Sequence, residues 1–248
     1  MTEQLAERYA FVTGAARGIG LAVARALIER GAHAVLVDVD SDALDAAAAA
    51  LGASALPIVA DVSRADEVAI AVQMAAQRLG GLHILVNNAG ICPMSPFEKI
   101  TEAEWERVLA VNLKSAFLCC QAALPYLRQC GKRGRIINMT SVAGEMGGVS
   151  VGAHYAASKA GLIGLTKSLA QRLAPDGVTV NCVAPGTVAT DLTAAWTPED
   201  LARSASKVPL GRLAQPEEIA EAVCFLASDR AAFITGATLD INGGMYLR

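Results

Sequence analysis

Short runs of consecutive apolar residues recur along the chain and alternate with longer stretches that have helical periodicity. The apolar runs predict strands at 9–13, 34–37, 56–60, 83–86, 135–139, 178–183 and 238–241. The periodic stretches predict helices at 21–30, 41–51, 63–79, 101–127 (two helices), 155–173 and 216–227. Strands that are apolar throughout are typical of parallel sheets covered by helices on both faces. The pattern therefore predicts a single-domain, doubly wound (Rossmann-type) α/β fold over residues 1–248.

Polar residues mark where two of the predicted helices begin. Ser63 is followed three residues later by Asp66, and Thr101 by Glu104, a spacing typical of capping boxes. Residues 187–214, in contrast, show no clear periodicity. In a compact domain, a segment of this length without regular structure predicts a functional loop or lid, here a substrate loop.

Composition and charge argue against several classes of protein. Lys and Arg total 21 against 24 Asp and Glu, and there is no basic stripe, so we expect no nucleic-acid partner. No apolar run approaches the roughly 20 residues that span a bilayer, so we expect no membrane partner. The first residues lack a signal-peptide pattern. The six cysteines show no metal-ligand spacing and indicate reduced thiols, which predicts no metal site and a cytoplasmic location.

A glycine-rich turn joins the first predicted strand to the first predicted helix. Its glycines are Gly14, Gly18 and Gly20, a spacing that departs from the G-x-G-x-x-G form. Glycines let the backbone approach a pyrophosphate closely, and the N-terminus of the following helix offers N–H groups and a positive dipole end. The next strand ends in Asp38, eighteen residues past Gly20, where a carboxylate suits a ribose 2′-hydroxyl. These features predict a dinucleotide site.

Tyr155 and Lys159 are four residues apart and share one face of a predicted helix. A tyrosine with its ordinary pKa of about 10 is a poor acid or base near neutrality. A lysine cation one turn away is expected to stabilise the phenolate and lower that pKa. The pair therefore predicts a tyrosine that exchanges a proton with an alcohol or a ketone.

Six motifs, in matching order and over essentially the whole chain, resemble those of the short-chain dehydrogenase/reductase family. They are Thr13-Gly14-xxx-Gly18-x-Gly20, Asn87-Asn88-Ala89-Gly90, Asn112, Ser141, Tyr155-xxx-Lys159 and Pro185-Gly186. Within the family the chain most resembles the 3-oxoacyl-carrier-protein reductase-like group, through residues 85–91, 159–164 and 242–246.

The resemblance implies catalytic roles for four residues. Tyr155 is the implied proton donor or acceptor, Lys159 lowers its pKa and binds the nicotinamide ribose, and Ser141 bonds the reacting oxygen. Asn112 is implied to hold a water that links Lys159 to solvent, whereas by residue type alone it is an ordinary helix asparagine. The cofactor supplies the hydride chemistry.

The resemblance also implies a cofactor-binding set. Its members are Gly14, Arg17, Gly18, Ile19, Gly20, Asp38, Asp61, Val62, Asn88, Ala89, Gly90, Tyr155, Lys159, Pro185, Gly186, Val188 and Thr190. Arg17 occupies a position where NADP-using relatives often carry a basic residue, but it can turn toward solvent, whereas Asp38 repels a 2′-phosphate. We therefore predict NAD as the cofactor, with NADP less favoured.

Three further residues are candidates for contact with the substrate. Glu145 follows Ser141 by four residues and is either an acceptor for substrate hydroxyls or a solvated loop residue. His154 faces away from Tyr155 on the helix, which predicts a structural or substrate-edge role. Trp196 either covers the pocket or packs within its own loop.

Docking of a carrier protein is implied for the resembled group by basic residues near the site. Lys132 matches one such position, but Asp176 stands where the other is usually arginine. Together with Asp38, this acid favours a polyol, sugar or hydroxy acid over a 3-oxoacyl thioester as the substrate.

The sequence thus predicts an NAD(H)-dependent oxidoreductase that interconverts a secondary alcohol and a ketone. NADPH-dependent reduction of a 3-oxoacyl-carrier-protein is the alternative enzyme. A non-catalytic nucleotide-binding sensor or scaffold is the alternative of another class. The resemblance implies a homotetramer, which the apolar last strand and the tail 245–247 also favour.

Overall fold

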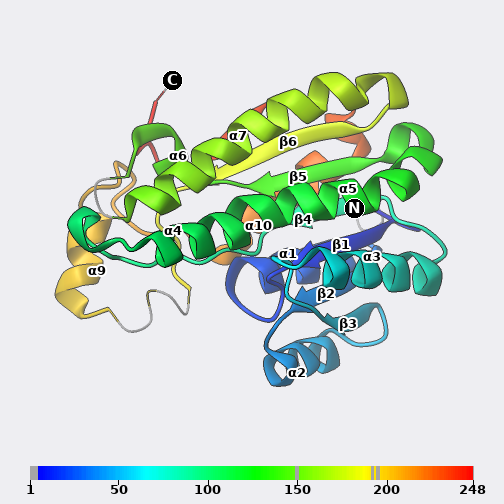
Figure 1. Cartoon of the computed structure of the whole chain (residues 1–248), viewed down its shortest axis with the longest axis horizontal. Coiled ribbons are helices and arrows are strands. Elements are labelled where there is room, and N and C mark those ends of the chain that lie inside the picture. Colours follow the sequence, from blue (N-terminus) through cyan, green and yellow to red (C-terminus); the bar gives the residue numbers. More distant parts are fainter. Residues whose placement is uncertain (1–4, 149–150, 191–192, 194–195, 248) are drawn as a thin grey trace.

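The computed structural model describes residues 5–148, 151–190, 193 and 196–247. Their strands form one parallel sheet in the order β3-β2-β1-β4-β5-β6-β7 (Figure 1). The bounds are β1 (Tyr9–Thr13), β2 (His33–Asp38), β3 (Ala55–Val59), β4 (Ile84–Asn87), β5 (Arg135–Met139), β6 (Thr179–Pro185) and β7 (Thr238–Ile241). The predicted doubly wound parallel sheet is confirmed.

The strand order reverses between β1 and β4, which lie side by side. Val12 of β1 pairs with Leu36 of β2 on one side and with Val86 of β4 on the other. The chain winds outward from this point in both directions, and such a switch point predicts a ligand-binding crevice beyond the carboxyl ends of these strands. The glycine turn and the segment 88–90 both lie at this crevice.

Helices cover both faces of the sheet (Figure 1). They are α1 (Gly18–Glu29), α2 (Ser41–Leu51), α3 (Ala65–Leu79), α4 (Glu102–Leu109), α5 (Ser115–Gln129), α6 (Ala143–Met146), α7 (Ala153–Leu173), α9 (Pro198–Ala205) and α10 (Pro216–Ala227). α1 packs against α10 on one face, and α3 packs against α5 on the other, where α7 also lies.

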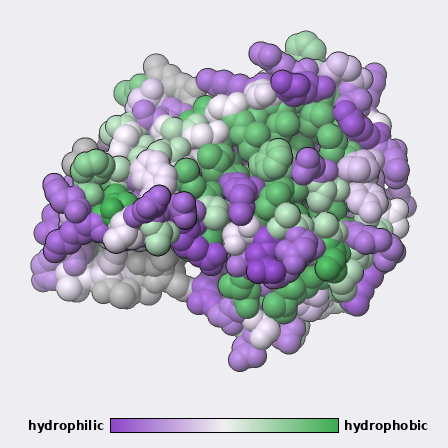
Figure 2. Space-filling view, in the orientation of Figure 1, coloured by the Kyte–Doolittle hydropathy of each residue, from purple (hydrophilic) through white to green (hydrophobic). Residues whose placement is uncertain are grey.

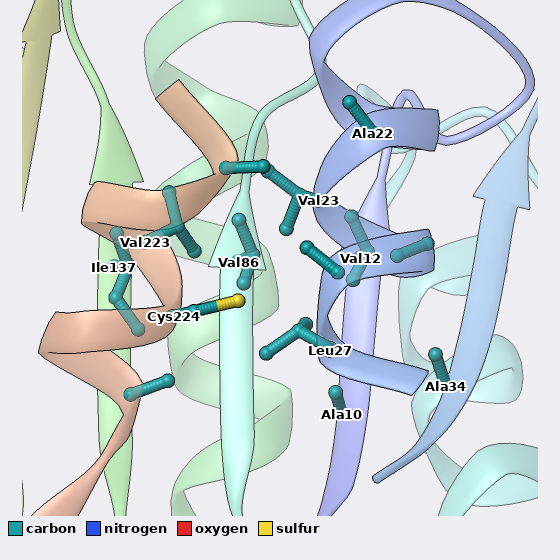
Figure 3. Close-up of a cluster of buried hydrophobic side chains, with 14 of the residues drawn as sticks. Ala10, Val12, Ala22, Val23, Leu27, Ala34, Val86, Ile137, Val223 and Cys224 are labelled. Atoms are coloured by element: carbon teal, nitrogen blue, oxygen red, sulfur yellow. The ribbon is translucent and has the colours of Figure 1, made fainter. Parts of the chain in front are cut away.

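Each face of the sheet has its own apolar core. On one face, Val12 and Val86 of the strands pack with Val23 and Leu27 of α1 and Val223 of α10 (Figure 3). The core on the other face joins the alternate strand residues to α3, α5 and α7. Because both faces of the inner strands are buried, these strands form continuous apolar runs in the sequence rather than alternating patterns.

Two predicted helix starts differ from the structure. α1 begins at Gly18, three residues before the predicted start, because the glycine turn runs directly into the helix. The capping box predicted from Ser63 and Asp66 is wrong. α3 begins at Ala65, and Ser63 instead donates hydrogen bonds from its N–H and its hydroxyl to the Asp61 carboxylate.

The cap predicted at Thr101 is confirmed for one of its two hydrogen bonds. The Thr101 hydroxyl accepts a hydrogen bond from the Glu104 N–H at 3.2 Å. The Glu104 carboxylate is directed to His154 and not back to the cap. The stretch 101–127 forms two helices, as predicted, and a π-helical turn at Ala110–Lys114 joins them.

Residues 187–214 contain regular structure that the sequence pattern did not predict. α9 begins with a capping box between Thr197 and Asp200. A single β-bridge ties Val188 to Ala214 at the two ends of the segment. α9 has eight residues and none of them is buried, so its periodicity is too brief to stand out in the sequence.

One helical span in the described part of the chain is long and apolar enough to cross a membrane by length and composition. It is Glu102–Gln129, which comprises α4, the π-helical turn and α5. Its residues Cys119, Ala123 and Leu127 are buried against the sheet in the second core. Its apolar character therefore matches its role as a sheet-covering helix.

Candidate active site

The four predicted catalytic residues meet beyond the carboxyl ends of the central strands. Ser141 follows β5, and Tyr155 and Lys159 lie one turn apart on α7. Asn112 approaches from the π-helical turn between α4 and α5. A Cβ added at Gly90 would lie 3.4 Å from both the Asn112 amide oxygen and Lys159 Nζ, so these two side chains are neighbours.

Tyr155 is held in its neutral form by burial. Burial raises the pKa of Tyr155 to about 12. The charge of Cys92 also raises this pKa by a smaller amount, whereas a hydrogen bond with Ser141 lowers it. The net shift of the Tyr155 pKa is therefore upward, opposite to the lowering that was predicted from Lys159. Lys159 Nζ donates a hydrogen bond to the Met139 carbonyl at 2.7 Å and lies 5.7 Å from the centre of the phenol ring. At neutral pH the site thus presents a phenol that can donate a proton.

Lys159 is a buried cation. Only 4% of the residue is exposed. Burial lowers the pKa of Lys159 to about 8, so the side chain keeps its proton at pH 7 and releases it in mildly alkaline solution. A buried charge of this kind costs stability, which is typical of a residue kept for function.

Lys159→Met is expected to raise the free energy of unfolding at pH 7 when no cofactor is added. The ordinary lysine pKa of 10.5 applies to the unfolded chain, so between pH 8 and 10.5 the unfolded state binds a proton that the folded state has released. The buried charge therefore costs at most roughly 3 kcal/mol below pH 8, and this cost disappears as the pH rises to 10.5. Urea unfolding at a series of pH values measures the difference.

Lys167→Met, on an exposed position of the same helix, is the matched control and is expected to change stability little at any pH. The Met139 carbonyl loses its donor in Lys159→Met, which offsets part of the gain. A difference between Lys159→Met and wild type that did not depend on pH would contradict this assignment of the buried charge.

Asn112 owes its position to the π-helical turn at Ala110–Lys114. Its amide oxygen accepts a hydrogen bond from the Ile91 N–H at 2.8 Å. Its amide nitrogen donates to the Ile91 carbonyl at 2.9 Å and to the Ser158 hydroxyl at 3.1 Å. The asparagine thus fixes the loop after β4 beside Lys159, which explains an otherwise unfavourable mid-helix residue. The bridging water implied by the resemblance stays a prediction.

The glycine turn after β1 is shaped by its backbone angles and by close contacts. Gly14 and Gly18 have φ angles of 63° and 56°, which residues with a side chain rarely adopt. A Cβ at Gly20 would lie 2.0 Å from the Gly14 carbonyl oxygen. Over the fully described α1, no side chain caps the first turn, which contains Ile19, and no acid lies in that turn. Its N–H groups therefore suit the pyrophosphate of a dinucleotide.

Thr13 and Asn88 hold the two loops of the crevice together. The Thr13 hydroxyl accepts hydrogen bonds from the N–H groups of Asn88 and Ala89, both at 3.0 Å. The Asn88 amide donates to the carbonyls of Thr13 and Gly14 at 2.9 and 3.0 Å. These bonds support the cofactor edge from within the protein, and direct cofactor contacts of 88–90 stay a prediction.

The acidic end of β2 lies next to the glycine turn. Asp38 accepts hydrogen bonds from the N–H groups of Ala16 at 3.2 Å and Val39 at 2.8 Å. The Arg17 side chain is 54% exposed, and its guanidinium pairs with Asp40. The second acid, Asp40, was not singled out from the sequence.

Asp61 and Val62 follow β3 at the same edge. Burial raises the pKa of Asp61, but hydrogen bonds from Ser63 and the charge of Arg107 lower it by more, so the net shift is downward. Asp61 Oδ2 lies 3.5 Å from the Arg107 guanidinium. Val62 is buried. The carboxylate is therefore ionised and fixed in place, and its contact with the cofactor stays a prediction.

The segment that follows β6 lies against the glycine turn. A Cβ at Gly18 would be 3.6 Å from the Thr190 methyl group, so these loops are in contact. The Gly186 N–H, just after Pro185, donates to the Ile241 carbonyl at 3.0 Å. Together with the Val188 bridge, these contacts bring this part of the predicted cofactor-binding set to the crevice.

The His154 ring is fully buried, which excludes direct substrate contact and leaves the structural role. Its Nδ1 accepts a hydrogen bond from the Tyr155 N–H at 2.8 Å, so the ring proton lies on Nε2, which donates to the Glu104 carboxylate at 2.9 Å. Glu104 also accepts from the Ser95 hydroxyl at 2.6 Å. His154 and Glu104 therefore tie the loop after β4 to the start of the catalytic helix.

Glu145 and Trp196 are the two remaining candidates for contact with the substrate. Glu145 lies half-buried on α6, the short helix that follows Ser141. The Trp196 N–H donates to the Thr193 carbonyl at 3.0 Å. The neighbouring residues 191–192 and 194–195 lie outside the described part of the chain. Substrate contact by either residue stays a prediction.

A buried polar row across the sheet was missed by sequence reasoning. Asn87 donates to the Asn138 amide oxygen at 2.8 Å, and Asn138 donates to the Thr166 hydroxyl of α7 at 2.7 Å. The Thr140 hydroxyl donates to the Lys159 carbonyl at 2.7 Å. These bonds fix α7, the helix that carries Tyr155 and Lys159, against β4 and β5. The available signal was an asparagine inside each of two otherwise apolar strands.

Among the described residues, no group of three or more His, Cys, Asp or Glu side chains is arranged to hold a metal ion. The six cysteines of the chain are all free thiols.

Known proteins match this chain over nearly its full length. A family model described as enoyl-(acyl carrier protein) reductase matches residues 14–246. The 3-oxoacyl-[acyl-carrier-protein] reductase of Vibrio cholerae is 43% identical over 240 residues, covering 97% of this chain and 98% of that protein. The corresponding reductase of Escherichia coli is 42% identical over 240 residues, with the same coverage.

Two other proteins carry different names. The cis-4-hydroxycyclohexanecarboxylate dehydrogenase of Sinomonas cyclohexanicum is 44% identical over 247 residues, covering 98% of both chains. A crystal structure from Brucella melitensis, titled short-chain dehydrogenase/reductase and glucose/ribitol dehydrogenase, superposes with a TM-score of 0.94 at 37% identity and covers 100% of both chains.

Proposed function

We propose that this chain, which belongs to the short-chain dehydrogenase/reductase family, uses NAD(H) to interconvert a secondary alcohol and a ketone. Its relatives are oxidoreductases of the CH–OH group, and so is this chain. The observation that carries the proposal is the convergence of Ser141, Tyr155 and Lys159 beside the glycine-turn crevice.

The bound nicotinamide supplies or takes up the hydride. Tyr155, neutral at pH 7, donates its phenolic proton to the carbonyl oxygen of a ketone, and the Ser141 hydroxyl hydrogen-bonds the same oxygen. Lys159 is a cation below pH 8 and stabilises the phenolate that this transfer leaves. In the reverse direction Tyr155 must first lose its proton, so alcohol oxidation is favoured by higher pH.

The first substrate candidate is a 3-oxoacyl compound. The relatives from Vibrio cholerae and Escherichia coli are named for this activity. Met94 and Phe97, in the loop after β4, and Met146, at the end of α6, are 60%, 74% and 53% exposed on segments that flank Tyr155. An apolar rim favours an acyl chain over the polyol or sugar that the sequence favoured.

The acid at Asp176 is a weaker objection to carrier docking than the sequence suggested. Asp176 pairs with Arg128 at 2.8 Å, and Lys132 lies against the next residue, Gly177, so basic residues surround the acid. This patch lies where β5 and β6 begin, at the opposite edge of the sheet from Tyr155. A carrier bound there would not lie at the active site of the same chain.

A cyclic hydroxy acid is the second substrate candidate, supported by the 44% identity to the cis-4-hydroxycyclohexanecarboxylate dehydrogenase.

The proposed preference for NAD(H) over NADP(H) rests on Asp38 and Asp40, whose negative charges oppose a 2′-phosphate. The names of the other relatives support reduction of a 3-oxoacyl group with NADPH as the alternative.

The test is a substrate panel with purified protein. A 3-oxoacyl thioester and a ketocyclohexane carboxylate are each offered with NADH and with NADPH, and a polyol is offered with NAD. The proposal predicts NADH consumption with the thioester at a rate above that with NADPH. Equal or faster turnover with NADPH would overturn the cofactor preference. Binding of NADH without turnover of any panel member would favour the non-catalytic sensor.

We also propose a homotetramer. Figure 2 shows hydrophobic side chains gathered over the face formed by α5 and α7. Trp105 of α4 and Phe117 of α5 are 38% and 47% exposed, and Leu247 of the tail is 82% exposed. Light scattering at micromolar concentration is expected to give about four times the chain mass of 25.6 kDa, and a smaller mass for Phe117→Glu. A monomer mass for the wild type would contradict the assembly. A cytoplasmic location stays a prediction.

A further inference from the structure

We propose that Asp40 sets cofactor selectivity together with Asp38, because it holds Arg17, the cation best placed to bind a 2′-phosphate. The inference rests on the proposed NAD(H) preference and deepens it. Arg17 is the residue before α1, and its guanidinium reaches across to the loop between β2 and α2, where it pairs with Asp40. Residues 13–18 and 38–42 form the two loops concerned, and Arg17 is the only cationic side chain in them.

Asp40 is fixed independently of its ion pair. Its Oδ1 accepts a hydrogen bond from the Ala43 N–H at 3.1 Å, which caps the N-terminus of α2. Its own N–H donates to Asp38 Oδ1 at 3.3 Å. With one oxygen held by the helix, the other is presented to Arg17. The acceptor is therefore pre-organised, which reduces the entropy lost in forming the pair.

The two acids act differently on a 2′-phosphate. Asp38 meets it directly with a like charge, whereas Asp40 withholds the guanidinium that would otherwise pair with it. Replacing Asp38 alone removes the repulsion but leaves Arg17 paired. The preference for NADH over NADPH is then expected to become smaller but not to reverse. Removing both charges releases Arg17 for the phosphate.

The substitutions are chosen to change charge with little change of structure. Asp40→Asn keeps a side-chain oxygen for the helix cap while losing the charge. Asp42→Asn, two residues on in the first turn of the same helix, is the matched control. It removes the same charge, but the Asp42 carboxylate accepts from the Ser41 hydroxyl and does not contact Arg17. Each asparagine variant is combined with Asp38→Ser. The double variant of Asp38→Ser and Asp40→Asn is also combined with Arg17→Met.

The readout is the dissociation constant of NADPH and of NADH, titrated by nicotinamide fluorescence at low and at high salt. In the Asp38→Ser background, Asp40→Asn is expected to strengthen NADPH binding about tenfold relative to NADH, as one charge-assisted hydrogen bond permits. Arg17→Met is expected to abolish this gain. High salt is expected to reduce the gain, because the groups are exposed.

Two results would overturn the inference. One is an equal gain from Asp40→Asn and Asp42→Asn, which would indicate net charge alone. The other is a gain that survives Arg17→Met. Equal NADH and NADPH affinity in the wild type would refute the proposed cofactor preference instead, and the contrast between the two asparagine variants would still decide the role of Asp40.

Discussion

Replacing Gly20 by Ala is expected to weaken NADH binding by roughly fivefold to 150-fold, the range that corresponds to an overpacking cost of about 1–3 kcal/mol. The added Cβ would lie 2.0 Å from the Gly14 carbonyl oxygen and 2.6 Å from the Asn88 amide nitrogen. Neither neighbour can yield, because Gly14 is backbone and Asn88 is held by the carbonyls of Thr13 and Gly14. The glycine turn must therefore shift away from the dinucleotide. Fluorescence titration with NADH measures the loss.

Gly164→Ala is the matched control for this prediction. Gly164 also lies within a helix, α7, but a Cβ there would meet nothing within 4 Å. Its replacement is expected to leave NADH affinity unchanged and to raise the free energy of unfolding by up to about 1 kcal/mol, since Ala is the better helix former. NADH affinity in Gly20→Ala equal to that of Gly164→Ala would show that the turn does not bind the cofactor as proposed.

Tyr155→Phe is expected to lower turnover roughly 10²–10⁴-fold, the contribution of positioned proton transfer. The substitution removes one hydroxyl from a half-buried side chain whose pKa is raised to about 12 by loss of contact with water, so the proton donor is lost and the apolar packing is kept. NADH affinity and thermal stability are expected to stay close to wild type. Steady-state turnover with saturating ketone, together with NADH titration, separates the two effects.

Tyr126→Phe, a partly buried tyrosine that packs on the second core, is the control and is expected to keep full turnover. Lys159→Met is expected to differ in kind and to impair both turnover and cofactor binding, because the ammonium is assigned to the phenolate and to the ribose. If Tyr155→Phe kept more than about a tenth of wild-type turnover, the proton-transfer role of Tyr155 would be wrong.

Features encoded in short stretches of sequence were predicted well. β1, the glycine turn, Asp38 and α2 follow one another within about forty residues, and each has its own local signal. The apolar runs identified the strands because the inner strands are buried on both faces. The order of the motifs then placed Ser141, Tyr155 and Lys159 at one edge of the sheet.

Features that depend on contacts between distant residues were not predicted. Glu104 and His154 are 50 residues apart, and a sequence read as helix caps gives no reason to pair them. The spacing of Tyr155 and Lys159 placed both on one helix face, but it did not reveal that Nζ bonds the Met139 carbonyl. The balance between burial and neighbouring charge decides the Tyr155 pKa, and burial becomes visible only in the folded chain.

Asp40 falls between these two cases. It lies two residues after Asp38, so the sequence contained it, but its importance comes from the guanidinium of Arg17, 23 residues earlier. A carboxylate at a helix start is expected to cap the helix, so the sequence offered no reason to assign Asp40 a second role. Only the geometry of the two loops shows both roles together.

The most direct test of hydride transfer at this site uses NADH in which both hydrogens at the reactive nicotinamide carbon are replaced by deuterium. With a 3-oxoacyl thioester as the ketone, mass spectrometry of the product formed by the wild type is predicted to show deuterium on the new carbinol carbon. Tyr155→Phe is predicted to bind the same NADH while forming the labelled alcohol at least about a hundredfold more slowly. Unlabelled alcohol from the wild type, or labelled alcohol from Tyr155→Phe at the wild-type rate, would contradict the account.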